Sequence, residues 1–409
     1  MISSIMQGGS QCENAPNLRV RANNMEIGAM MAPRSLIMVA ATGDWTKNTP
    51  REEYPAVQSI FRLLGAESSV ESVQFDAPHN YNQQSREAVY TFFNKRLLDV
   101  PGPVPEKRFQ LEQLGDLLAL HQRQRPAGAV TADQYIADRI ADANRVIERD
   151  RSPEACRERL AFSILATRPA PAELLSARLD KLPQGERLLL GRKGQGDRLP
   201  AVWLEPRRAN PAAPATLLVH PDGAAWSLSS SESTNGLVKA ILARGGAVLA
   251  IDAFQTGSAR APRDRSKRFF TTFNQTDDAN RVQDVLTALE YLRSRTSRQD
   301  VNLLGLELGG VWSLFARALA DDQVTLAADL AQFRVSTDSE YLEKFFIPGI
   351  RKAGDFRAAA TLVNSGKTLL YNASPEFPQA RQDRVPDADL AAWLVPEPPA
   401  AKRSSKRSR

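Results

Sequence analysis

The sequence predicts an α/β protein, and three observations lead to that fold class. Short apolar runs, such as residues 36–41 and 246–251, have the composition of strands buried on both faces of a parallel sheet. Stretches with apolar residues at helical spacing separate these runs. Glycine and polar residues follow several runs directly, as in the loops at the carboxyl ends of parallel strands. We therefore expect strands and helices to alternate along the chain.

Residues 1–100 predict two strand–helix units. Strands are expected at 36–41 and 70–75, and helices at 54–64 and 84–97. The first helix should begin near Thr49 and Pro50, because proline is favoured in the first helical turn. Two strands are too few for a doubly wound sheet, so this region is expected to be the C-terminal part of a first domain.

A proline-rich stretch at 101–105 predicts a domain boundary. Residues 101–180 are interpreted as a helical linker, and residues 181–395 as a second α/β domain with a nearly full set of strands. Those strands are expected at 187–190, 201–204, 216–220, 246–252, 301–304 and 367–371. Residues 396–409 are expected to be a disordered basic tail.

The net charge of +6 over 409 residues does not indicate a nucleic-acid partner. The charge is concentrated at the end of the chain, at Lys402, Arg403, Lys406, Arg407 and Arg409. The rest of the chain is nearly neutral, so no basic face is predicted. No apolar run approaches the ~20 residues of a membrane span, and no secretory signal is visible, so the compartment stays undetermined.

Cysteine and histidine are scarce. The chain has 2 cysteines, Cys12 and Cys156, and 3 histidines, His79, His121 and His220. They are too few and too far apart for a disulfide framework or a zinc site. His121 is expected on a helix surface, so catalytic candidates are restricted to His79 and His220.

An aspartate and a histidine follow two successive strands of the first region. Asp44 lies in Gly43-Asp44-Trp45 after the first strand, and His79 lies in Asp76-Ala-Pro-His79-Asn80 after the second. A carboxylate one strand away from a histidine can orient its imidazole, as in a Ser-His-Asp triad. The order Asp before His is that of α/β-hydrolases. The alternative interpretation is a turn aspartate and a surface histidine.

The surrounding sequence resembles a bacterial α/β-hydrolase family of the acetyl xylan esterase-like type. The similar segments are residues 6–19, 32–44 and 75–82, within a resemblance that covers residues 1–98. The resemblance implies a serine esterase that removes acetyl or similar acyl groups from a small-molecule or saccharide ester. It also implies that Asp44 is the triad acid and His79 the general base, with no metal or organic cofactor.

The family's nucleophile elbow, Gly-x-Ser-x-Gly, would lie upstream of Met1. Ser10 cannot replace it, because it lacks the preceding strand and the following glycine that the elbow needs. We therefore expect the chain to be the C-terminal portion of a longer protein whose upstream half carries the nucleophile. Since triad members act as a unit, these residues are expected to have little or no activity alone.

A degenerate elbow is predicted in the second domain. Gly305-Leu306-Glu307-Leu308-Gly309 joins a strand to a helix, with Glu307 at the nucleophile position. His220 and Gly223 resemble a remnant of the oxyanion loop, in which the histidine shapes the loop, and Glu376 is interpreted as a relic of the acid. No histidine follows His220, so this domain lacks the late histidine that a Ser-His-Asp triad of this fold needs as its base.

Residues 19–38 and 351–370 run parallel in pattern, as in a tandem repeat with one competent and one decayed copy. The second domain is accordingly expected to be a degenerate α/β-hydrolase. Two alternatives stay open for its role. It could be a non-catalytic pseudo-hydrolase that binds or scaffolds, or a hydrolase in which Glu307 is the nucleophile.

Overall fold

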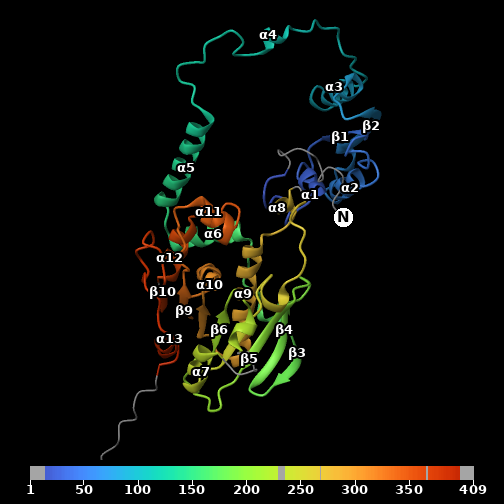
Figure 1. Cartoon of the computed structure of the whole chain (residues 1–409). Helices are drawn as coiled ribbons and strands as arrows, with labels where there is room; N and C mark the ends of the chain where they lie inside the picture. The colour runs from blue at the N-terminus through green and yellow to red at the C-terminus, as the bar shows by residue number, and fades with distance from the viewer. Residues whose placement is uncertain (1–13, 229–234, 268, 365–366, 397–409) are drawn as a thin grey trace, which may run out of the picture. The chain divides into compact units, whose positions relative to one another are not determined.

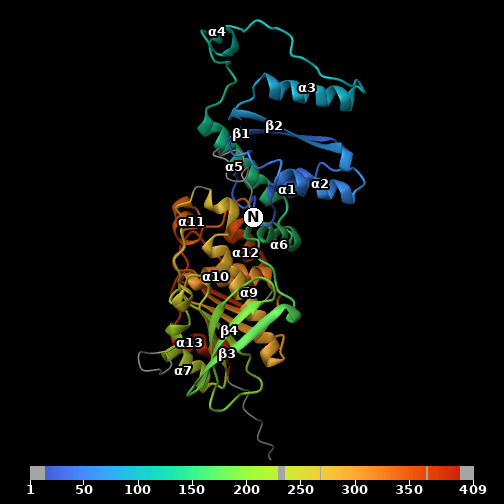
Figure 2. The same ribbon diagram turned by 90° about the vertical axis from the view of Figure 1, so that its right-hand side faces the viewer.

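The computed structural model describes residues 14–228, 235–267, 269–364 and 367–396 (Figures 1 and 2). The chain forms two compact units. Unit 1 consists of Met1–Ala132 and Asp264–Asn274, and unit 2 of Asp133–Arg263 and Gln275–Arg409. The predicted bounds of a first domain at 1–100, a linker at 101–180 and a second domain at 181–395 stay predictions. The basic tail at 397–409 lies outside the described residues.

Unit 1 contains the two predicted strand–helix units. The strands β1(Leu36–Gly43) and β2(Val70–Pro78) pair in parallel, and the helices α2(Glu53–Leu63) and α3(Gln83–Leu97) follow them. A short helix, α1(Asn24–Ala29), precedes β1, and η2(Glu67–Ser69) precedes β2. Helices α1 and α3 begin where asparagine side chains accept backbone N–H groups, from Glu26 to Asn23 and from Ser85 to Asn82. The core is small and lies under α2, where Val57 and Phe61 are buried.

Strand β1 is less buried than its composition predicts. Residues 36–39 are half-buried, and only Ala40 and Ala41 are buried in this strand. Among the described residues β1 pairs on one edge only, with β2. The prediction of a strand buried on both faces is therefore wrong for this unit, because a two-stranded sheet cannot cover all of its apolar surface.

Two further segments belong to unit 1. Residues 103–106 lie along α3, where Glu106 forms a bidentate ion pair with Arg86 at 2.5 and 2.7 Å. Residues 264–274 include α8(Phe270–Phe273) and join unit 1 although they stand between two elements of unit 2. Backbone bonds of 2.8 Å run from Asn17 N to Thr271 O and from Arg19 N to Thr272 O. No local sequence pattern predicted that residues of this segment pack in unit 1.

Unit 2 contains one 8-stranded sheet of order β10-β9-β8-β6-β7-β5-β4-β3. Its strands are β3(Leu174–Leu182), β4(Gly185–Arg192), β5(Leu199–Leu204), β6(Thr216–Val219), β7(Val248–Ile251), β8(Val301–Gly305), β9(Val324–Asp329) and β10(Thr368–Tyr371). Strands β6 to β10 run parallel, whereas β3, β4 and β5 form antiparallel pairs, the last also with β7.

The strand order confirms the predicted fold class. Counted from β4, the sheet has the order 1-2-4-3-5-6-7 with the second strand antiparallel, which is the arrangement of the α/β-hydrolase fold. Strand β3 is an additional edge strand. Most of its residues were assigned to the end of the helical linker, and that assignment was wrong. The strand lies at an exposed edge of the sheet and most of its residues are exposed, so no buried apolar run marks it in the sequence.

Helices cover both faces of this sheet. Leu217, Val219, Leu249 and Ile251 face one apolar cluster, and the intervening Leu218 and Ala250 face another, as expected for alternating side chains. The helices of unit 2 are α5(Ala132–Arg149), α6(Pro153–Ile164), α7(Gly236–Ala243), α9(Asp277–Thr296), α10(Leu308–Leu319), α11(Asp338–Lys344), α12(Asp355–Val363) and α13(Asp387–Leu394), with the short turns η3(Pro171–Glu173), η4(Ala224–Ser227) and η5(Gly257–Ala259).

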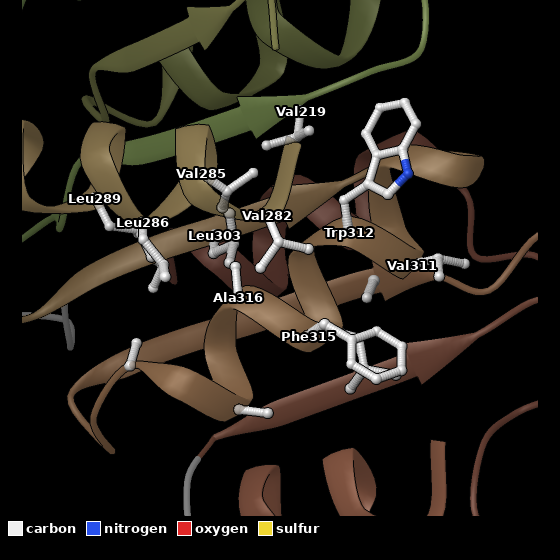
Figure 3. Packing of buried hydrophobic residues seen from close by; sticks show 14 of the residues in the cluster. Val219, Val282, Val285, Leu286, Leu289, Leu303, Val311, Trp312, Phe315 and Ala316 are labelled. Atoms are coloured by element: carbon white, nitrogen blue, oxygen red, sulfur yellow. The ribbon is translucent and has the colours of Figure 1, made fainter. Parts of the chain in front are cut away.

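The larger cluster lies between the sheet and the helices α6, α9, α10 and α12. Figure 3 shows Val282 of α9 beside Trp312 of α10 within this cluster. Cys156 is 2% exposed in this cluster, so α6 packs as part of the core although its residues were assigned to the linker. None of the described helices has the length and apolar character needed to cross a membrane.

Candidate functional site

Asp44 and His79 meet at the carboxyl ends of β1 and β2. The parallel register places Gly43 opposite Pro78, so the next residue on each strand is one of the pair. The Nδ1 atom of His79 lies 3.0 Å from Oδ2 of Asp44. The spacing that was read from the sequence therefore brings these two side chains into hydrogen-bond contact.

The close approach of the strand ends depends on Gly43. A Cβ atom at this position would lie 2.9 Å from the Ala77 carbonyl oxygen and 3.0 Å from Pro78 Cα. The register shifts between Ala41 and Gly43, as at a β-bulge. Glycine is the residue that allows this approach, because it has no side chain to collide with the neighbouring backbone.

The Asp44 side chain is 7% exposed and is held by more than the histidine. Its Oδ1 atom accepts hydrogen bonds from the Thr46 backbone N–H at 2.7 Å and from the Thr46 hydroxyl at 2.5 Å. Burial acts to raise the pKa of Asp44, but the bonds from Thr46 and His79 outweigh it, so the pKa is lowered. The carboxylate is thus ionised and fixed in orientation.

The His79 ring is accessible, since its side chain is 63% exposed. It lies beside the Trp45 ring, with centroids 4.2 Å apart at a tilt of 34°. With Nδ1–H donated to Asp44, Nε2 carries the lone pair and can take a proton from another group. Among the described residues no hydroxyl group bonds to His79, and Ser10 lies outside the described residues.

The elbow of unit 2 has a strained backbone at Glu307, with φ 50° and ψ −135°. This is a conformation that residues other than glycine rarely adopt. The neighbouring glycines leave no room for relaxation, because a Cβ would lie 2.4 Å from Val219 O at Gly309 and 1.9 Å from Asp329 O at Gly310. At Gly305 a Cβ would lie 2.5 Å from Gly310 Cα. The predicted sharp turn between strand and helix is therefore present.

His220 follows β6 and is 4% exposed. Its Nδ1 accepts the Asp222 backbone N–H at 3.0 Å, and its ring stacks on Trp226 with centroids 4.7 Å apart. Burial lowers the pKa of His220 despite the opposing charges of Glu307 and Asp222. Its Nε2 lies 4.0 Å from Oε1 of Glu307, a proximity that the sequence analysis did not predict.

The Asp252 side chain lies so close to Gly223 that only glycine fits there. Asp252 was not among the predicted site residues. Gly223 has φ 75°, and a Cβ there would lie 2.1 Å from Oδ1 of Asp252. That oxygen accepts the Ala224 N–H at 2.6 Å, while Oδ2 accepts the Ser258 N–H at 3.0 Å. The available signal was the position of Asp252 directly after a buried strand.

Glu376 does not join this cluster. Its Oε2 accepts the Ser336 backbone N–H at 3.0 Å, and no hydrogen bond among the described residues links it to Glu307 or His220. Asn372 stands directly after β10 instead and donates to Oδ1 of Asp329 at 2.7 Å. The structure thus brings Glu307 near His220 but leaves Glu376 in a contact that holds a loop.

The described residues contain no group of three or more histidine, cysteine, aspartate or glutamate side chains that could hold a metal ion. The two arrangements differ in which of their side chains is exposed. The first is an oriented acid–base pair with an accessible imidazole, and the second is an exposed carboxylate beside a buried imidazole.

The sequence matches no protein-family model. It is similar to the protein of Bacillus subtilis (strain 168) named "Putative hydrolase YtaP", with 24% identity over 219 residues, covering 48% of this chain and 72% of the relative.

Solved structures show weaker similarity. They include dipeptidyl peptidase 4 of Porphyromonas gingivalis (TM-score 0.32, 13% identity, 55% of this chain and 37% of that chain). A cold-adapted esterase from an Arctic intertidal metagenomic library has a TM-score of 0.30 and 15% identity, with 53% of this chain and 95% of that chain covered. A carboxyl esterase of Bacillus coagulans has a TM-score of 0.29 and 13% identity, with 54% and 86% covered. The assignment of unit 2 to the α/β-hydrolase fold rests on its own strand order.

Proposed function

We propose that unit 1 contributes the acid and the base of a serine carboxylester hydrolase of the acetyl xylan esterase-like type. The contact of 3.0 Å between His79 and a buried, ionised Asp44 is the observation that supports this proposal. The nucleophilic serine would come from a segment that precedes Met1. The substrate would be a small-molecule or saccharide ester with an acetyl or similar acyl group.

In this proposal His79 acts through Nε2. It takes the proton of the serine hydroxyl as the oxygen attacks the ester carbonyl carbon, and Asp44 stabilises the imidazolium that forms. The proton then passes to the leaving alcohol as the acyl–oxygen bond breaks. Water, deprotonated by the same nitrogen, releases the acid and restores the serine.

An assay of the 409-residue chain with p-nitrophenyl acetate tests the need for an upstream serine. We expect little or no turnover from this chain. A longer protein translated from an in-frame upstream Gly-x-Ser-x-Gly should hydrolyse the ester and lose this activity in His79→Ala. Turnover by the 409-residue chain that His79→Ala abolishes would contradict the proposal, because the serine would then lie within the chain.

Unit 2 supports two alternatives. The strained backbone of Glu307 favours a carboxylate nucleophile, because such strain persists where the surrounding structure maintains it, often at functional sites. The contact of Glu376 with Ser336 favours a non-catalytic pseudo-hydrolase that binds or scaffolds, because the acid position is used to hold a loop. Hydrolysis of an epoxide or alkyl halide that Glu307→Gln abolishes would support the first, and saccharide binding that survives Glu307→Gln without hydrolysis would support the second.

A further inference from the structure

A basic cavity lies in unit 2, away from the Glu307–His220 site of the same unit. It has a volume of about 380 Å³ and is lined by Gln184, Arg207, Arg208, Lys239, Leu242 and Ala243. Strand β5 ends beside the start of β7, so the loop that carries the two arginines lies at the amino ends of the parallel strands. Glu307 and His220 follow the carboxyl ends of β8 and β6, at the opposite edge of the sheet.

The three cations of this cavity have no acidic partner among the described residues. Arg207, Arg208 and Lys239 are exposed and form no described ion pair or side-chain hydrogen bond. In a second cavity of unit 2, of about 390 Å³, Arg357 is bonded to Asp355. Three like charges around one cavity repel each other, and an anion placed between them would relieve that repulsion.

Two carboxylates of the adjoining strands have partners of their own. Glu205 accepts the Trp203 indole N–H at 2.8 Å. Glu186 forms an ion pair with Arg295 at 2.6 Å. Both carboxylates therefore bond to residues other than the three cations of the cavity.

The walls of the cavity are held in place. Gln184 donates from Nε2 to the Glu205 carbonyl oxygen at 2.9 Å, and its own carbonyl oxygen accepts the Glu205 N–H at 3.1 Å. The loop after β5 is fixed to the end of α7, because Asn210 N donates to Gly245 O at 3.1 Å. A site whose backbone is already ordered loses less conformational entropy when a ligand binds.

We propose that this cavity binds a small molecule that carries a phosphate group. Two guanidinium groups present planar pairs of N–H donors that match phosphate oxygens, and the Lys239 ammonium adds a third positive charge. Leu242 and Ala243 provide an apolar wall for the organic part of the ligand, and Gln184 provides an amide for a neutral polar group.

Isothermal titration with inorganic pyrophosphate, at low ionic strength and with the full chain, tests the proposal. The variant Arg207→Gln/Arg208→Gln/Lys239→Gln should bind at least about tenfold more weakly than the parent, because it loses charge-assisted hydrogen bonds. The matched control is Lys352→Gln/Arg381→Gln/Arg384→Gln, which removes the same charge from exposed residues outside the cavity. It should stay within about twofold of the parent, since exposed charges at a distance are screened.

Equal weakening in the two triple variants, or no saturable binding by the parent, would overturn the proposal. A titration with a single-stranded oligonucleotide separates a small-ligand site from a surface for polyanions. Oligonucleotide binding that exceeds one site per chain and that both variants weaken equally would also overturn it. One pyrophosphate per chain, lost selectively in the cavity variant, would support it.

Discussion

The two histidines that directly follow strands, His79 after β2 and His220 after β6, differ in which member of the acid–histidine pair is buried. In unit 1 the Asp44 side chain is 7% exposed and the His79 side chain is 63% exposed. In unit 2 the His220 side chain is 4% exposed and the Glu307 side chain is 64% exposed. A buried carboxylate can hold an accessible imidazole for proton transfer, whereas a buried imidazole stacked on Trp226 is suited to shaping a loop. The two sites thus differ in which side chain of the acid–histidine pair is buried, and this difference decides what each histidine can do.

The largest effect is expected from removing the charge that orients His79. In the longer protein proposed above, Asp44→Asn should lower kcat for ester hydrolysis on the order of 10⁴-fold, because the imidazole loses its correct tautomer. The control is Asp76→Asn, whose carboxylate accepts the Thr42 hydroxyl and not the histidine. Similar activity of Asp44→Asn and Asp76→Asn would remove the distinction between the two histidines.

The next largest effect is expected from adding a side chain at the two glycines that lie against neighbouring backbone, Gly310 and Gly43. Gly310→Ala should lower the free energy of unfolding by about 3 kcal/mol, because the new Cβ would meet a backbone oxygen. The predicted Cβ separations are 1.9 Å from Asp329 O at Gly310 and 2.9 Å from Ala77 O at Gly43. Gly43→Ala should therefore cost less, about 1 kcal/mol.

Urea denaturation followed by tryptophan fluorescence measures both changes. Gly236→Ala is the control in unit 2, because a Cβ at Gly236 would have no neighbour within 4 Å. If Gly310→Ala were as stable as Gly236→Ala, the elbow would not be held by the close contacts described above.

The pH dependence of stability should also differ between the sites. Burial lowers the pKa of His220 from its ordinary 6.5, so below pH 6.5 the unfolded chain binds a proton that the native histidine does not. Stability is lost as the pH falls below that value. The pKa of Asp44 is lowered from 3.8, so its contribution is lost only as the pH falls below about that value.

This difference is measured by the denaturation midpoints of the parent and of His220→Asn, taken at about pH 7.5, 6 and 5. Burial raises the pKa of Asp284 to about 7, and its contribution is lost as the pH rises, which opposes that of His220. The comparison between parent and variant isolates the histidine. Equal slopes in the two proteins would contradict the assignment of His220 as a buried neutral group.

The smallest effect concerns the ring beside the proposed base. Trp45→Ala should lower kcat/KM of the longer protein by about fivefold, because an aromatic contact contributes roughly 1 kcal/mol beyond its area to the orientation of His79. Trp393→Ala, which removes a tryptophan that lies beside Lys367 in unit 2, serves as the control. Equal rates for the two variants would mean that Trp45 does not orient the imidazole.

Much of the fold could be predicted because its signals are local. The strand at 36–41 coincides with β1 and the apolar stripe at 54–64 with α2, since the apolar spacing of each element is contained in its own residues. The predicted helix start near Thr49 and Pro50 was wrong, because α2 begins at Glu53. The contact between Asp44 and His79 was also predictable, because adjacent parallel strands bring their carboxyl ends together. Strand β3 was missed because its alternating pattern was weak beside the helical residues that precede it.

The rest depended on contacts between distant residues. The Thr272 hydroxyl donates to the carbonyl oxygen of Asn14, a residue 258 positions away in the sequence, and no local pattern predicts such a contact. Asp252 and His220 acquire their roles from loops that meet at the sheet edge. The cations of the basic cavity come from a loop and a helix whose proximity only the packing of unit 2 creates.

The sequence by itself determined the alternation of strands and helices, the sharp turn around Glu307 and the placement of an aspartate and a histidine at neighbouring strand ends. These follow from side-chain periodicity and backbone preferences within a few residues. Only the tertiary structure decided which member of each acid–histidine pair is buried, that Glu376 holds a loop, and which cations have no acidic partner within the described part of the chain. Burial and charge pairing depend on what the folded chain brings close from elsewhere, and solvent exposure is a property of the packed molecule.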